Sequence, residues 1–185
     1  GIVANITAGT NTNNETLMPV FMKTTDGGVT WGNPIEVDLD AIPWIADSLQ
    51  SLWIDSLGNP ASDGRAVATF DYDITVDVNG NVHMGVVIGT AGGGFAVSSA
   101  LAKFMADVYT TDGGATWDVA YLAPVLTFRG TYGSGSSPIT IDNFCQTSRN
   151  EAGDKIIFTW VDSDTSVTFG SQNGIGFGES GNLAP

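Results

Sequence analysis

The sequence predicts an all-β fold of short antiparallel strands with one inserted helix. Glycine is abundant, at 24 of 185 residues, and Asn, Thr, Ser and Asp recur in clusters that favour tight turns. An eight-residue pattern occurs twice, each time between two apolar or alternating runs. Residues 73–78 alternate, and a turn at Asn79-Gly80-Asn81 separates them from the apolar run 82–88. With 42% hydrophobic residues, the chain has enough apolar side chains for a core.

The repeated pattern is Thr-Thr-Asp-Gly-Gly-x-Thr-Trp, which occupies residues 24–31 and 110–117, so that Asp112 lies 86 residues after Asp26. The runs 17–22 and 35–39 flank the first copy, and 104–109 and 119–122 flank the second. An Asp-Gly pair between such runs predicts a hairpin turn, in which the carboxylate accepts nearby backbone N–H groups. Trp31 and Trp117 are each expected to be substantially buried against their own hairpins.

These octads resemble the Asp-box, or BNR repeat, of the sialidase-like β-propellers, whose pattern is Ser/Thr-x-Asp-x-Gly-x-Thr-Trp. The matching residues are Thr24, Asp26, Gly28, Thr30 and Trp31 in the first copy, and Thr110, Asp112, Gly114, Thr116 and Trp117 in the second. In that family the box joins the third and fourth strands of a blade, at the edge of the propeller and away from its ligand face. The resemblance therefore implies a structural turn for both octads.

The resemblance implies that the chain covers about two blades of four antiparallel strands, with the following boundaries. Residues 1–39 form the closing strands of one blade with the first box, and residues 71–122 form a full blade with the second box. Residues 139–162 form the opening strands of a third blade. Propellers close with roughly 4 to 8 blades, so we expect a partner protein or further blades of the same polypeptide. A small β-sandwich built from the same strands is the alternative fold.

Residues 40–58 depart from the β pattern and predict the inserted helix. Their apolar residues recur mostly at spacings of three and four, namely Ile42, Ile45, Leu49, Leu52, Trp53 and Leu57. Asp40 is expected to cap the helix, Pro43 suits its first turn, and Gly58 suits its end. We expect its apolar face to pack against the side of the propeller, the alternative being a helix that binds a partner.

Charge and composition argue against nucleic-acid binding and against insertion into a membrane. The chain has 6 Lys and Arg against 20 Asp and Glu, a net charge of −14, which argues against binding to nucleic acid. The most apolar stretch, residues 95–108, is short and contains Lys103, so no membrane insertion is expected. Cys145 is the lone cysteine and is expected to be a buried apolar side chain. The hairpin expected for the third blade contains Asn-Glu-Ala-Gly-Asp-Lys-Ile at 150–156 and Thr-Trp-Val-Asp-Ser-Asp at 159–164. It resembles surface and secreted proteins of Bacteroidota, which implies an extracellular or cell-surface location.

The leading hypothesis is a non-catalytic module that makes binding or structural contacts with a glycan or a protein. The alternative, a fragment of a sialidase-like glycoside hydrolase, follows from the resemblance, because sialidases need three arginines around the substrate carboxylate. The chain offers Arg65, Arg129 and Arg149, without the sequence context typical of sialidases. No residue is assigned a catalytic role, and the lone His83 is interpreted as structural.

The sequence also contains candidate residues for ligand and metal binding. An aromatic, glycine-rich segment predicts a ligand face containing Tyr121, Phe128, Arg129 and Tyr132, to which Trp44 and Trp53 could contribute. No cofactor or metal ligand is assigned. The pairs Asp71 with Asp73 and Asp162 with Asp164 could donate oxygens to calcium, but neither continues into a full calcium loop, and capped turns are the default interpretation.

Overall fold

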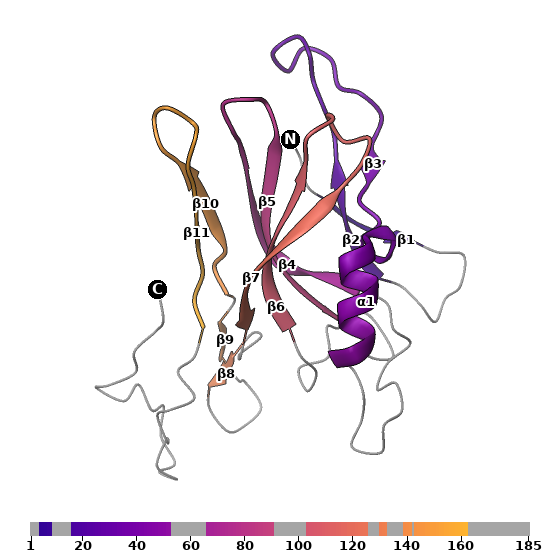
Figure 1. Cartoon of the computed structure of the whole chain (residues 1–185), viewed down its shortest axis with the longest axis vertical. Coiled ribbons are helices and arrows are strands. Elements are labelled where there is room, and N and C mark those ends of the chain that lie inside the picture. The colour runs from indigo at the N-terminus through magenta and orange to yellow at the C-terminus, as the bar shows by residue number, and fades with distance from the viewer. Residues whose placement is uncertain are drawn as a thin grey trace.

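The computed structural model describes residues 4–8, 16–52, 66–90, 103–125, 130–132, 139–141 and 143–162. Antiparallel β-sheets dominate these segments, which confirms the all-β class. Three of the sheets lie side by side, and their hairpin turns gather at one end of the molecule (Figure 1).

The central sheet has four antiparallel strands in the order β4-β5-β6-β7. They are β4 (Ala66–Val76), β5 (Val82–Thr90), β6 (Lys103–Thr110) and β7 (Asp118–Val125). The sheet includes the described residues of the segment 71–122, which was predicted as one blade, and the second octad lies between its third and fourth strands. It begins earlier than predicted because Ala66, Val67 and Ala68 are apolar and fully buried.

The other sheets are smaller. The first has the order β1-β2-β3, with β1 (Ala4–Ala8), β2 (Thr16–Phe21) and β3 (Ile35–Glu36), so the first octad lies between β2 and β3. The third sheet is the hairpin of β10 (Gln146–Arg149) and β11 (Ile156–Thr159). A further pair consists of β8 (Gly130–Tyr132) and β9 (Ile139–Ile141).

Residues 139–162 were predicted as the two opening strands of one blade, the first of them running from Ile139 to Ser148, and this first strand is not continuous. Ile139–Ile141 pairs with β8, whereas Gln146–Arg149 pairs with β11. Between the two strands Phe144 has a φ of 49°, in the left-handed region that non-glycine residues rarely adopt. Since that conformation cannot continue an extended strand, the chain changes sheets here.

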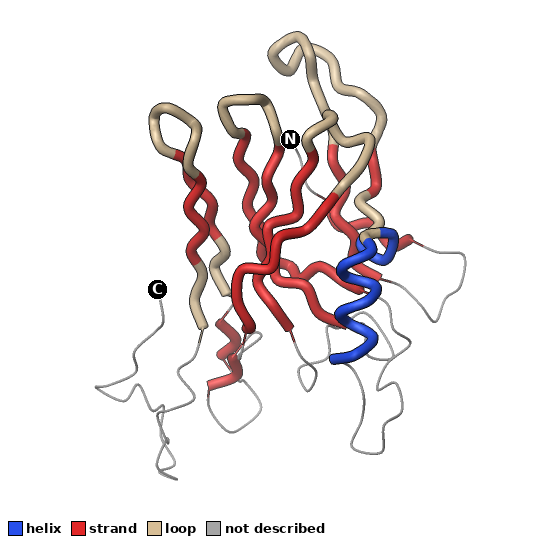
Figure 2. The backbone as a smooth tube through the Cα atoms, viewed as in Figure 1, coloured by secondary structure: helices blue, strands red, loops and turns tan. Residues whose placement is uncertain are grey.

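The inserted helix is present but shorter than the predicted 40–58. A 3₁₀ turn, η1 (Leu39–Ala41), precedes α1 (Pro43–Leu52), which begins at the proline as predicted (Figure 2). The predicted cap at Asp40 was wrong: Asp38 accepts the Asp40 N–H at 3.1 Å and caps η1. Asp40 instead accepts the N–H of Ala66 at 2.7 Å and so ties the turn to β4. The predicted end at Gly58 lies outside the described residues.

Apolar side chains cover both faces of the central sheet. On one face Met84, Val86 and Ile88 of β5 pack with Leu39, Ile42 and Ile45 from η1, α1 and the residue between them. On the other face Val87 and Met105 pack with Cys145 and Trp160, which come from the region of the third sheet. Burial raises the pKa of the Cys145 thiol to about 12, with a further contribution from the negative charge of Asp71, so Cys145 is an apolar core residue as predicted. In the described part of the chain, no helix is long and apolar enough to cross a membrane.

The contact between the central and third sheets depends on Gly85. A Cβ atom there would lie 2.8 Å from Thr147 Cγ2, 3.0 Å from Phe158 Cδ1 and 3.2 Å from Met105 Cε. We predict that Gly85→Ala destabilises the protein by about 1 to 3 kcal/mol, the usual cost of overpacking, as measured by urea denaturation. Because Thr147→Ser removes the nearest methyl group, Gly85→Ala/Thr147→Ser should recover part of the loss. Unchanged stability of Gly85→Ala would contradict this packing.

Candidate functional site

The first octad turn, residues 24–31, is held together by its own side chains. Asp26 accepts the Thr30 N–H through Oδ1 at 2.9 Å and the Thr30 hydroxyl through Oδ2 at 2.6 Å. The Thr24 hydroxyl donates to Asp26 Oδ1 at 2.8 Å and accepts the Gly28 N–H at 2.8 Å. Gly28 has a φ of +93°, which explains why the pattern requires glycine there.

The second octad turn, residues 110–117, repeats these bonds atom for atom. Asp112 accepts the N–H and the hydroxyl of Thr116 at 2.9 and 2.6 Å. The Thr110 hydroxyl donates to Asp112 at 2.8 Å and accepts the Gly114 N–H at 2.9 Å. The two octads therefore form the same turn, each between two paired strands of its own sheet.

Both turn carboxylates are stabilised in their ionised form. Hydrogen bonds from the side chain and backbone of Thr30, and then from Thr24, lower the pKa of Asp26 to about 2. The corresponding bonds from Thr116 and Thr110 lower the pKa of Asp112 still further. Carboxylates held in this way accept hydrogen bonds and do not exchange protons near neutral pH.

The expectation that both tryptophans are buried against their own hairpins was wrong for Trp31, which is 42% exposed. Trp117 is partly buried and packs on the core between the helix and the central sheet. It also meets Phe21 of the first sheet edge-on, with ring centroids 5.6 Å apart. The octad thus fixes the turn, whereas the neighbouring sheet decides how far the tryptophan is buried.

A pair of carboxylates joins the central sheet to the third sheet. Asp71 Oδ2 accepts the Cys145 N–H at 2.7 Å, and Asp73 Oδ2 accepts the Thr147 N–H at 2.9 Å. Alternate residues of β4 thereby hold alternate backbone groups at the start of β10. We call this pair the carboxylate clamp. It gives a backbone-binding role to the Asp-x-Asp pair that was considered for calcium; of the other pair, Asp164 lies outside the described residues.

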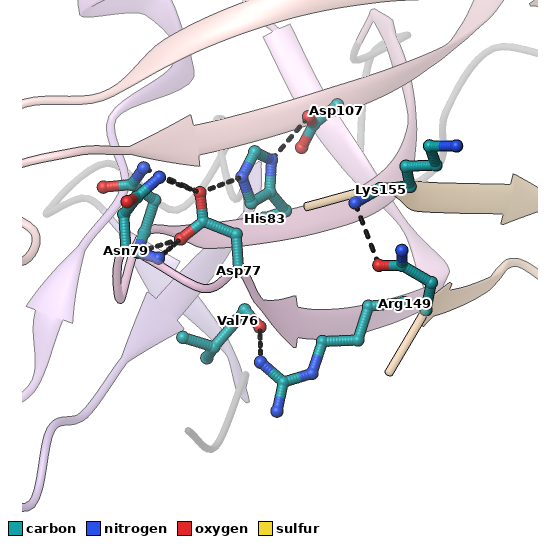
Figure 3. A network of polar contacts seen from close by, with 9 residues as sticks. Val76, Asp77, Asn79, His83, Asp107, Arg149 and Lys155 are labelled. Atoms are coloured by element: carbon teal, nitrogen blue, oxygen red, sulfur yellow. Dashed lines mark hydrogen bonds and ion pairs between the residues drawn. The ribbon is translucent and has the colours of Figure 1, made fainter. Parts of the chain in front are cut away.

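Figure 3 shows a second polar network beside the turn between β4 and β5. Asp77 Oδ1 accepts the N–H groups of Asn79 and Asn81, both at 2.8 Å. Burial disfavours the ionised form of Asp77, but the hydrogen bonds from Asn81 and Asn79 outweigh it and lower the pKa. His83 places Nδ1 2.8 Å from Asp107 Oδ2 and Nε2 3.9 Å from Asp77 Oδ2.

Within this network Asp107 is buried, and burial raises its pKa even though the His83 contact acts in the opposite direction. His83 also stacks on the Tyr109 ring, with centroids 5.8 Å apart. The interpretation of His83 as structural did not include its contact with Asp107, because that pairing across β5 and β6 has no local sequence signal. Both ring nitrogens face carboxylates, so the imidazole acts as a link within the sheet.

Hydrogen bonds join the hairpin ends of the central sheet and the third sheet directly. Val78 donates its N–H to the Gly153 carbonyl at 2.8 Å, and Arg149 Nη1 donates to the Val76 carbonyl at 2.6 Å. Arg149 is thus engaged in a contact between sheets (Figure 3). Arg65 and Arg129, the other two arginines considered for a substrate carboxylate, lie outside the described residues.

Two residues considered for ligand binding do come together on the surface. Tyr121 of β7 and Trp44 of α1 are 47% and 38% exposed, and their ring centroids are 5.9 Å apart. Both rings rest on the buried Phe104, at 5.4 Å from Trp44 and 5.7 Å from Tyr121. We call the two exposed rings the aromatic platform. Tyr132 belongs to β8, and Phe128, Arg129 and Trp53 lie outside the described residues.

Comparisons with known proteins add no identification: no family model, no curated protein and no solved structure matches the chain. Among the residues that the structure describes, no group of three or more His, Cys, Asp or Glu side chains could hold a metal ion.

The different surroundings of the two octads predict different mutational costs. Trp117→Ala should destabilise the protein by about 3 kcal/mol, because it removes a partly buried ring from the core and from Phe21. Trp31→Ala should cost less than about 1 kcal/mol, since that ring is largely at the surface. Chemical denaturation of both variants measures the costs, and equal costs would contradict the described packing.

Acid should weaken the octad turns selectively. In the folded protein the pKa of Asp26 is about 2, below its ordinary value of 3.8, and the pKa of Asp112 is lowered further. The ionised forms of both carboxylates therefore stabilise the fold at neutral pH. This contribution is lost as the pH falls below about 4. Asp112→Asn should therefore lower the urea midpoint at pH 7, and its difference from the unaltered protein should shrink towards pH 2.5. Asp47→Asn, an exposed helix position, is the control, and a difference for Asp112→Asn that stays constant with pH would refute the prediction.

Proposed function

We propose that the chain is a non-catalytic binding or structural module of an extracellular or cell-surface protein, built from sheets that stack like blades of an Asp-box propeller. One observation carries the proposal: five of the described carboxylates, at residues 26, 71, 73, 77 and 112, accept backbone N–H groups. Asp26, Asp112 and Asp77 accept N–H groups of their own turns, and the clamp residues Asp71 and Asp73 accept N–H groups of the third sheet. A catalytic carboxylate must instead reach a substrate and exchange a proton with it.

The propeller arrangement is favoured over a two-layer sandwich by the order of the sheets. The central four-stranded sheet has its octad between its last two strands, β6 and β7, and the first sheet, with three described strands, has its octad between its last two, β2 and β3. A sandwich has two packed sheets. Here the central sheet is covered on one face by η1 and α1, with the first sheet touching Trp117, and on its other face by the third sheet. In this proposal, further sheets of the same repeat complete the propeller.

The aromatic platform is the proposed contact surface of the module. Each exposed ring offers a flat apolar face beside a polar tip, which suits the apolar face of a sugar ring. The planes of the Trp44 and Tyr121 rings are tilted by 51° to each other, so the two rings form an angled surface. The buried Phe104 supports both rings, and they come from two different elements, α1 and β7. A glycan is therefore the proposed ligand class, and no cofactor or metal is required for this contact.

Glycan binding can be measured on an array of sialylated and neutral glycans, followed by calorimetry with the best binder. Trp44→Ala and Tyr121→Ala should each weaken binding at least about tenfold, a loss of about 1.4 kcal/mol. Trp31→Ala is the matched control, because its ring is similarly exposed but lies in the first octad turn. Equal weakening by Trp31→Ala, or no binding by the unaltered chain, would contradict the glycan platform. Release of free sugar from the bound glycan would contradict the non-catalytic assignment.

A further inference from the structure

The two octad turns have the same hydrogen bonds but different surroundings. Thr110 and Gly114 of the second turn are buried, and Trp117 is partly buried. Their counterparts in the first turn are more accessible: Thr24 is half-buried, while Gly28 and Trp31 are exposed. Because the sequences of the octads are almost identical, the difference comes from what lies against each turn.

The first sheet covers the second turn through Phe21 at the end of β2, Lys23 two residues beyond it, and Ile35 at the start of β3. The Phe21 ring meets Trp117 edge-on, at an interplanar angle of 74°. Ile35 Cδ1 lies 3.4 Å from the position of a Cβ at Gly114, and Lys23 Nζ lies 3.0 Å from that position at Gly113. We call this set of an aromatic ring, a branched aliphatic side chain and an ammonium group the covering triad.

The corresponding face of the first turn has no such cover from the described residues. A Cβ at Gly27 would meet nothing within 4 Å, and one at Gly28 would meet only Trp31 of the same turn. Val29 is 81% exposed and Trp31 is 42% exposed, so this turn presents two large apolar side chains to solvent. In the second turn the equivalent region is covered by the first sheet, so the first turn presents to solvent a face that its counterpart buries.

We propose that this face docks a further sheet unit of the same repeat, which presents a covering triad like Phe21, Ile35 and Lys23. The occupant belongs to the same protein, since the inference rests on the stacking of sheets proposed above. A second copy of the chain fits less well, because its Phe21 already packs on its own Trp117. A lysine in the triad also complements the ionised Asp26 and the net charge of −14.

The test places a second copy of residues 1–65 before residue 1, so that an added first sheet precedes the natural one. Hydrogen exchange followed by mass spectrometry then compares the segments 23–32 and 109–117. The added sheet should slow exchange in 23–32 at least about tenfold and bring it close to that of 109–117. Phe21→Ala with Ile35→Ala, made only in the added copy, should abolish this protection.

Unchanged exchange in 23–32, with 109–117 protected as before, would overturn the proposal.

A second measurement on the natural chain keeps the test decisive if the added copy does not fold. There Phe21→Ala should make 109–117 exchange about as fast as 23–32, and unchanged protection would show that the first sheet does not act as a cover. A dimer of the natural chain that is lost in Trp31→Ala would also overturn the proposal, because a second copy would then be the occupant. Glycan binding through Trp44 and Tyr121 is read separately, so failure of the platform is distinguishable from failure of this docking face.

Discussion

The arrangement of the sheets depends on how the outward backbone N–H groups at the start of β10 are satisfied. A buried N–H without an acceptor costs about 1 to 3 kcal/mol, so a strand cannot lie against another sheet unless its free donors find partners. The carboxylate clamp provides them, since Asp71 and Asp73 accept the N–H groups of Cys145 and Thr147. Once β10 is fixed there, Gly85 leaves the space into which Thr147 and Phe158 pack, and Cys145 joins the core.

The same use of carboxylates runs through the molecule at shorter range. Asp26, Asp112 and Asp77 each hold a hairpin turn by accepting nearby backbone N–H groups. The acidic composition therefore has a structural basis in these places, because each carboxylate replaces an acceptor that a tight turn cannot supply. These turns also contact the neighbouring sheets. The second octad turn is covered by the first sheet, and the Val78 N–H of the central sheet donates a hydrogen bond to the Gly153 carbonyl of the third sheet.

Features set by residues close in sequence could be predicted. The octad turns need only side chains within four residues of each other, and Pro43 marks the helix start because its ring suits a first turn. Contacts between distant residues could not be predicted: Asp73 meets Thr147 across 74 positions, and His83 meets Asp107 across two strands. The strand break at Phe144 and the exposure of Trp31 likewise depend on neighbours rather than on local pattern. Within the predicted ligand face, Tyr121 comes close to Trp44 because of the position of α1, which no local pattern of the sequence gives.

The most direct test of this account is an NMR measurement of scalar couplings across the clamp hydrogen bonds. Couplings between the amide nitrogens of Cys145 and Thr147 and the side-chain carboxyl carbons of Asp71 and Asp73 report the bonds themselves. The account predicts both couplings at neutral pH, together with slow exchange of the two amide protons. Absence of both couplings, with fast exchange of these amides in a folded protein, would show that carboxylates do not hold the third sheet and would contradict the account.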